Sequence, residues 1–122
     1  MIHGIVNDQL EAIVPVTLMT PAGPAIELAA IIDTGYNGCL AIPRSFAQSI
    51  GLPAIAPRNV TLGDGSLQIL DYFTGQIRWN GQVRRIRILA TKDEFLLGTA
   101  LLEDLRLEAT FRPGERVTIS PA

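Results

Sequence analysis

Short apolar runs separated by turn residues occur along almost the whole chain. Ala25 to Ile32 is a mostly apolar run that ends in β-branched residues and predicts a strand. Glu11 to Met19 predicts a second strand, and Pro15 within it indicates an edge or bulge position, since proline donates no ladder hydrogen bond. The turn residues of Thr20 to Pro24 lie between the two runs, so we expect a hairpin.

Two more hairpins are predicted in the second half of the chain. Val60 to Leu62 and Leu67 to Phe73 flank a glycine-rich turn at residues 63–66. The second hairpin turns at Asn80-Gly81, because Asn-Gly between alternating residues is the strongest short hairpin signal. Its expected strands are Gln76 to Trp79 and Gln82 to Ala90.

Shorter elements fill the remaining segments. Pro43 to Ile50 predicts a helix that ends at Gly51, and Thr99 can cap a second short helix over Ala100 to Leu105. Pro53 to Pro57 predicts an irregular connector. Short strands are expected at Ile2 to Val6, Cys39 to Ile42, Phe95 to Gly98, Arg106 to Phe111 and Arg116 to Ser120. This pattern predicts a single mainly β, barrel-like domain over residues 1–122, with one or two short helices.

Composition narrows the functional classes. The chain has 122 residues, of which 48% are hydrophobic, and this content argues against disorder. A net charge of −2 and a pI near 5.3 give no electrostatic signature of nucleic-acid binding. The one basic cluster, Arg84-Arg85-x-Arg87, lies in a strand-like run, where we interpret it as solvent exposure or edge protection.

The expected setting is a soluble cytoplasmic protein without metal or cofactor. Cys39 is the single cysteine, so no internal disulfide can form, and a reducing compartment fits best. The N-terminal residues lack the pattern of a signal peptide, and no apolar run approaches the roughly 18 residues of a membrane span. His3 and Cys39 alone cannot supply a zinc ligand set.

Asp33 is the candidate for chemistry, because the apolar run Ala29 to Ile32 leads directly into Asp33-Thr34-Gly35. An ionised carboxylate next to a buried strand needs a hydrogen bond or a charged partner. The alternative is a structural aspartate that bonds its own turn backbone. Two later features follow in order, the Gly63-Asp64-Gly65-Ser66 turn and Leu96-Leu97-Gly98 before a short helix, and each alone is an ordinary connection.

The order of these three features resembles the retropepsin-like aspartic proteases, in particular their small prokaryotic single-domain members. The resemblance extends from about Glu11 to about Phe111 and implies a closed acid-protease barrel. It implies that Asp33 is catalytic and that Thr34 and Gly35 hold the active-site loop, with Thr34 linking two such loops across a dimer. It also implies that the hairpin around Gly63 is a flap, and that the supporting residues Leu96, Leu97 and Gly98 pack behind the loop.

The chemistry independently favours a homodimer. Hydrolysis by this route needs one ionised carboxylate to activate water and one protonated carboxyl to bond the carbonyl oxygen. The chain holds a single Asp-Thr-Gly, so a two-fold axis would place Asp33 beside its symmetry copy. Two carboxylates about 3 Å apart then share one proton. The resemblance suggests the terminal strands, Ile2 to Val6 and Val117 to Ser120, as the dimer interface.

Substrate would be a polypeptide, and the residues expected to bind it are Tyr36, Asn37, Gly38, Leu62, Gly63, Asp64, Gly65 and Ser66. Tyr36 departs from the family pattern, since a small or hydroxyl residue usually follows Asp-Thr-Gly. Its bulk requires the side chain to point away or to reshape the pocket. Tyr36 therefore favours one alternative, a dimer that binds extended peptides with weak or no hydrolysis. A second alternative is an unrelated small β-barrel with a structural Asp33.

Overall fold

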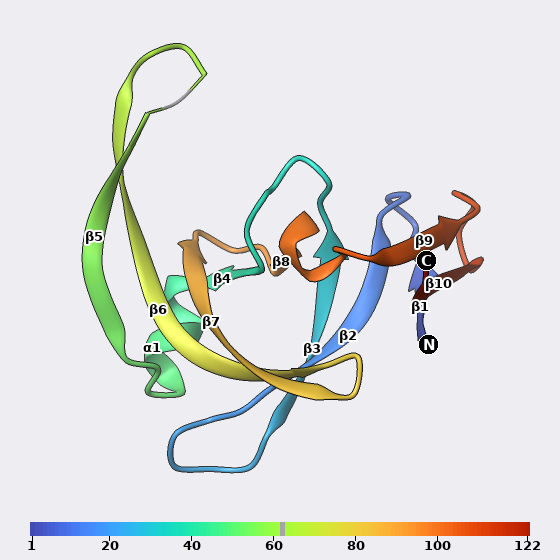
Figure 1. Cartoon of the computed structure of the whole chain (residues 1–122), viewed down its shortest axis with the longest axis horizontal. Coiled ribbons are helices and arrows are strands. Elements are labelled where there is room, and N and C mark those ends of the chain that lie inside the picture. The colour runs from blue at the N-terminus through green and yellow to red at the C-terminus, as the bar shows by residue number, and fades with distance from the viewer. Residues whose placement is uncertain (62) are drawn as a thin grey trace.

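The computed structural model describes residues 1–61 and 63–122 of the chain (Figure 1). Within these residues the chain forms ten strands, one α-helix and one 3₁₀ helix. The helices are α1 (Arg44–Ser49) and η1 (Thr99–Leu101). The strands are β1 (Ile2–Val6), β2 (Ala12–Leu18), β3 (Ile26–Ile32), β4 (Leu40–Pro43), β5 (Ala54–Thr61), β6 (Leu67–Trp79), β7 (Gln82–Thr91), β8 (Leu96–Leu97), β9 (Leu105–Ala109) and β10 (Arg116–Pro121).

Six strands close into a barrel, which confirms the mainly β, barrel-like prediction. The ring runs β2–β3–β8–β4–β7–β6 and closes where Thr17 and Leu18 of β2 pair with Arg78 and Ile77 of β6. Because side chains alternate along a strand, each barrel strand can turn one set of residues inward. The interior holds fully buried aliphatic side chains, among them Leu18, Leu40, Ile42, Ile77, Ile88 and Leu97.

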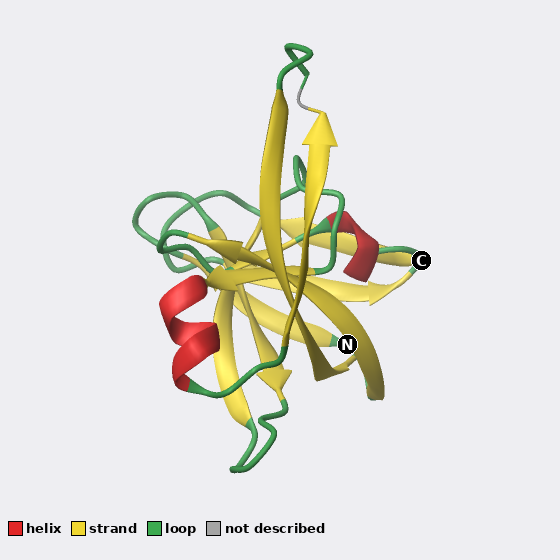
Figure 2. Cartoon of the chain, turned by 90° about the vertical axis from the view of Figure 1, so that its left-hand side faces the viewer, coloured by secondary structure: helices red, strands yellow, loops and turns green. Residues whose placement is uncertain are grey.

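Two extensions leave the barrel on opposite sides. On one side β1, β10 and β9 continue the sheet from β2, and on the other β5 pairs with β6 (Figure 1). The β5–β6 hairpin projects from the body of the molecule, as Figure 2 shows. β1 pairs with both β2 and β10, and β10 pairs with both β1 and β9. The terminal strands therefore lie inside this sheet, and β9 forms its outer edge.

Several local predictions are confirmed. Asn80 and Gly81 both have positive φ, 51° and 78°, as a type I′ hairpin turn requires. The helix α1 ends at Ser49 with Ile50 as its C-cap, and Gly51 follows with a φ of 76°. Pro15 is exposed and lies between the segment of β2 that pairs with β1 and the segment that pairs with β6.

Other local predictions are wrong for long-range reasons. β6 is one strand of 13 residues rather than two, because Thr74 and Gly75 stay paired with β7. The expected connector is strand from Ala54 onward; Pro53 lies before this strand, and Pro57 lies at a register shift between Ile55 and Arg58. The second helix is only Thr99–Leu101, with no side-chain cap, and Leu105 already belongs to β9.

Within the described part of the chain, no helix has the length and apolarity to cross a membrane.

Candidate functional site

Asp33 lies directly after β3, where its backbone N–H donates to the carbonyl of Leu97 at 2.9 Å. Its carboxylate Oδ1 accepts a hydrogen bond from the Gly35 N–H at 2.9 Å, and its carbonyl accepts one from the Tyr36 N–H at 3.1 Å. The side chain is partly buried. The run before it is less buried than expected, because Ala29 is exposed while Ala30 is buried. The Asp33 carboxylate is thus fixed by a tight Asx turn.

The loop from Asp33 to Cys39 is fastened to the segment that follows β8. β8 is inserted between β3 and β4, where Leu97 pairs with both Ile32 and Leu40. Beyond β8, the N–H groups of Gly98, Thr99 and Ala100 donate to loop carbonyls at 2.9 to 3.2 Å. These bonds join residues about sixty positions apart in sequence. Backbone hydrogen bonds to the segment after β8 therefore hold the acid-bearing loop in place.

Tyr36 folds back onto the base of its own loop. Its ring lies over Gly38, where an added Cβ would meet the Tyr36 hydroxyl oxygen at 2.2 Å. A Cβ on Gly98 would meet the Gly38 carbonyl oxygen at 2.1 Å and Tyr36 Cδ2 at 2.7 Å. The Tyr36 hydroxyl makes a long contact of 3.4 Å with the carbonyl oxygen of Leu40. Two glycines therefore create the space that the tyrosine ring occupies.

The surroundings of the Tyr36 hydroxyl favour its neutral form. The pKa of Tyr36 is raised from 10.0 to about 12, first by burial of the phenol and then by the nearby Tyr72 and Cys39. Thr99 adds a hydroxyl contact of 3.4 Å to the Tyr36 carbonyl oxygen. Thr99 therefore supports the loop, and this explains why it does not cap η1 as the sequence suggested.

A groove of about 940 Å³ adjoins this loop. Its wall contains the loop residues Gly35 to Cys39 and two residues near the tip of the β5–β6 hairpin, Thr61 and Gly63. The floor and far side come from β6 and β7, with Leu70, Tyr72, Arg84, Arg85, Ile86, Arg87 and Leu89. In Figure 1 the hairpin rises on one side of this region and the 33–39 loop on the other. Asp33 itself is not among the residues that line the groove; its carboxylate accepts a hydrogen bond from Gly35, which is, and so lies next to the groove.

The tip of the β5–β6 hairpin is a second Asx turn. Asp64 Oδ1 accepts hydrogen bonds from the Ser66 hydroxyl at 2.6 Å and the Ser66 N–H at 2.9 Å. The hydroxyl bond, and then the backbone bond, lower the pKa of Asp64. Gly65 has a φ of 85°, which a side chain would strain. Asp64, Gly65 and Ser66 are exposed and outside the groove wall, and Leu62 lies outside the described residues.

The structure brings only part of the predicted set together. Gly35, Tyr36, Asn37, Gly38 and Gly63 line one groove, Thr34 is exposed beside it, and Leu96, Leu97 and Gly98 lie behind the loop. Sequence reasoning missed Tyr72 and the arginines of β7. The Asn80-Gly81 turn could have found them, because it fixes the register that sets Tyr72 opposite Leu89 and Thr74 opposite Arg87.

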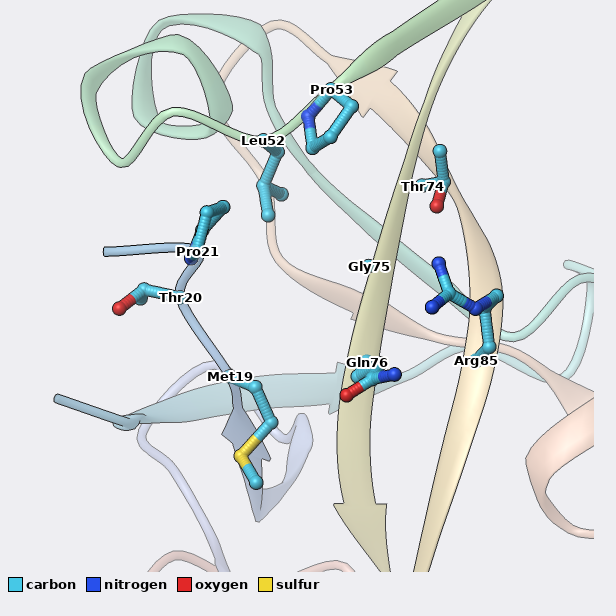
Figure 3. Close-up of a pocket in the computed structure, with 9 residues that line it drawn as sticks. All are labelled: Met19, Thr20, Pro21, Leu52, Pro53, Thr74, Gly75, Gln76 and Arg85. Carbon is cyan, nitrogen blue, oxygen red and sulfur yellow. The ribbon is translucent and has the colours of Figure 1, made fainter. Parts of the chain in front are cut away.

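A second pocket, of about 250 Å³, lies between β6, the residues that follow β2 and the residues that follow α1 (Figure 3). It is lined by Met19, Thr20, Pro21, Leu52, Pro53, Thr74, Gly75, Gln76 and Arg85. Only Arg85 among these is charged, so the pocket offers no acid–base pair. Among the described residues, no cluster of three or more potential metal ligands occurs.

Comparison with protein-family models found no match, and comparison with curated proteins found no significant relative.

Proposed function

We propose that the protein is a homodimeric aspartic endopeptidase of the retropepsin-like type, which cleaves polypeptides with water held between two Asp33 carboxylates. The observation that carries this proposal is the placement of Asp33. Its carboxylate is fixed at the end of a barrel strand, braced by β8, and adjoins a groove that a projecting hairpin borders. The single cysteine fits a reducing compartment, so we expect the enzyme to act in the cytoplasm.

Catalysis would use one carboxylate from each copy. The ionised Asp33 takes a proton from water while the protonated Asp33 of the second copy donates a hydrogen bond to the scissile carbonyl oxygen. Water oxygen bonds to the carbonyl carbon, and the C–N bond then breaks as the nitrogen receives a proton. No covalent enzyme intermediate is needed. Thr34 is exposed beside Asp33, where it can contact the partner loop.

The β5–β6 hairpin would act as a flap. It borders the groove opposite the 33–39 loop and projects beyond the barrel (Figure 2). Closure over an extended peptide would exclude bulk water and offer main-chain hydrogen bonds. The volume of the groove, about 940 Å³, is large enough to hold several residues of a peptide.

Because Asp33 forms an Asx turn, the variant Asp33→Asn can test the role of the carboxylate without loss of the turn. Asparagine at position 33 can still accept the Gly35 N–H through its side-chain oxygen, so Asp33→Asn removes the charge and keeps the turn. We would compare wild type and Asp33→Asn on a peptide library by mass spectrometry, from roughly pH 4 to 7.5. Cleavage by wild type alone supports the proposal. Equal cleavage by both proteins contradicts it.

A second candidate is a dimer that binds extended peptides without hydrolysing them. Tyr36 favours it, because this bulky side chain lines the groove where related enzymes carry a small residue. It predicts a folded dimer that retains peptides on both wild type and Asp33→Asn, with no cleavage at any pH. A structural Asp33 predicts instead that Asp33→Ala destabilises the fold and that Asp33→Asn changes nothing.

A further inference from the structure

The arginines of β7 stand in the wall of the groove rather than on an unrelated surface. Residues 84–87 pair with β6 on one side, while β4 pairs with β7 only from Ile88 onward. This half of β7 therefore has an open edge, and four consecutive residues along it line the groove. The predicted exposure of Arg84, Arg85 and Arg87 is confirmed. Because these exposed arginines lie in the groove wall, they can contact a molecule bound in the groove.

The charged side chains that line the groove are all positive. The three arginines are the charged side chains in its wall, and no carboxylate lines it within the described residues. The ion pairs of the described residues lie outside the groove wall and involve other arginines, namely Arg44, Arg106 and Arg112. The chain as a whole carries a net charge of −2, so this concentration of positive charge is local. Such a wall attracts anionic groups and repels cationic ones.

Arg87 is the best placed of the three. Its guanidinium carbon lies 6.0 Å from the centre of the Tyr72 ring, which also lines the groove. This distance is at the outer limit of cation–π contacts, and Arg87 is in none of the ion pairs of the described residues, so the guanidinium N–H groups are available to a carboxylate. Arg85 is shared with the smaller pocket, and Figure 3 shows its guanidinium reaching across toward β6 beside Thr74. Arg84 and Arg87 line the large groove and do not line the smaller pocket.

We propose that the groove selects polypeptide segments that carry an acidic side chain, and that Arg87 binds that carboxylate. The inference rests on the proposed function, since it takes the groove as the peptide site. The ligand is an acidic peptide in extended form. A glutamate or aspartate would pair with Arg87 in a geometry that glutamine or lysine cannot supply.

Binding can be measured without cleavage on full-length Asp33→Asn protein. Fluorescein-labelled peptide pools would carry Glu, Gln or Lys at one fixed position among randomised neighbours, and anisotropy would report affinity. We expect Glu to be preferred over Gln by about two- to fivefold, as for exposed ion pairs, and Lys to bind worst. The preference should shrink as NaCl rises from about 50 to about 500 mM, because salt screens exposed charges.

Matched variants assign the preference to its residue. Arg87→Gln should remove it, and Arg87→Lys should restore only part, since lysine keeps the charge and loses the planar fork. Arg78→Gln is the control, because Arg78 is an exposed arginine of the same sheet outside the groove wall. Equal binding of Glu and Gln pools overturns the inference, as does an equal loss in Arg78→Gln. Tighter, Arg87-dependent binding of a labelled oligodeoxythymidine than of any peptide pool also overturns it.

Cleavage separates this inference from the proposed function. Wild-type cleavage that is indifferent to Glu at every position overturns the acidic preference and leaves the protease standing. If no cleavage occurs but Glu pools bind in a way that depends on Arg87, the proposed protease activity is contradicted and the recognition of acidic peptides is supported. Cleavage with a Glu preference that Arg87→Gln abolishes supports both.

Discussion

The side chain of Tyr36 shows how one residue constrains others that are distant in sequence. Its ring needs the space that Gly38 and Gly98 leave, and Gly98 lies more than sixty residues away. The acid-bearing loop is also joined to the segment after β8 by backbone hydrogen bonds: the Gly98 N–H donates to the Cys39 carbonyl, and the Tyr36 carbonyl accepts from the Thr99 N–H. A bulky residue after Asp-Thr-Gly is therefore compatible with a well-ordered loop, provided that both glycines are retained.

Gly98→Ala tests this packing. Its φ of −93° suits any residue, so the cost of a methyl group is purely steric, against backbone oxygen at 2.1 Å. We expect a loss of about 1–3 kcal/mol in the free energy of unfolding, measured by urea denaturation. Gly63→Ala is the control, because nothing lies within 4 Å of its Cβ position, and it should change stability by less than about 0.5 kcal/mol. Equal stability of the two variants would contradict the packing described here.

The buried phenol predicts a stability that depends on alkaline pH. Tyr36 has a pKa of about 12 when folded and close to 10 when unfolded, so folding favours the neutral form. Its contribution is complete below pH 10 and is lost as the pH rises toward 12. Tyr36→Phe keeps the ring and cannot ionise. Urea midpoints from pH 8 to 12 should therefore fall more steeply for wild type than for Tyr36→Phe, whereas parallel curves would mean that the hydroxyl is solvated.

At the scale of elements, the β5–β6 hairpin is the part of the fold that stands apart from the core. Its tip adopts a φ of 85° at Gly65, and the tip of the β6–β7 hairpin adopts 78° at Gly81, with open space around both. Alanine at either position costs about 1–2 kcal/mol in local backbone energy. The same substitution can therefore be made in both hairpins: the β5–β6 hairpin borders the groove, whereas the turn residues of the β6–β7 hairpin are outside the groove wall.

If the β5–β6 hairpin closes over peptide, Gly65→Ala should lower kcat/KM by severalfold through the strained tip. Gly81→Ala should lower thermal stability and leave kcat/KM of the folded protein unchanged. Steady-state cleavage of one fluorogenic peptide, with thermal unfolding of both variants, provides the comparison. A similar fall in kcat/KM for both would show that strain acts through stability rather than through a flap.

The sequence predicts those elements that depend on residues close together in the chain, and it fails for those that depend on contacts between distant residues. The Asn80-Gly81 turn, the stop of α1 at Gly51 and the β2–β3 hairpin follow from local chemistry and were predicted. β6 was divided at Thr74-Gly75 because glycine disfavours strands, yet cross-strand pairing with β7 keeps it whole. Barrel closure between β2 and β6, and the contact of Tyr36 with Gly98, have no local signature. The groove wall was consequently only half predicted.

For the whole molecule, the proposed chemistry needs a surface that receives a second copy. The terminal strands were the expected interface, but the edges of β1 and β10 are already paired within the chain. The outer edge of β9 is open in the described sheet, and exposed apolar side chains, Ile5, Leu10 and Phe111, lie on this sheet or in its connecting turns. We expect the partner to dock along this side, by sheet extension or by covering these side chains.

A subunit-mixing experiment tests whether one site needs two chains. Wild type and Asp33→Asn would be refolded together so that protomers pair at random, with the amount of wild type held constant. If each site takes one Asp33 from each copy, mixed dimers are inactive, and activity per wild-type chain should equal the wild-type fraction. It would fall to about one half in an equal mixture and to about one tenth with ninefold excess of the variant. Mixing wild type with Arg78→Gln, which keeps Asp33, should leave activity per total chain unchanged. Constant activity at every ratio of Asp33→Asn would mean that a single chain carries the complete site, and the acid–base pair would then have to be sought within one barrel.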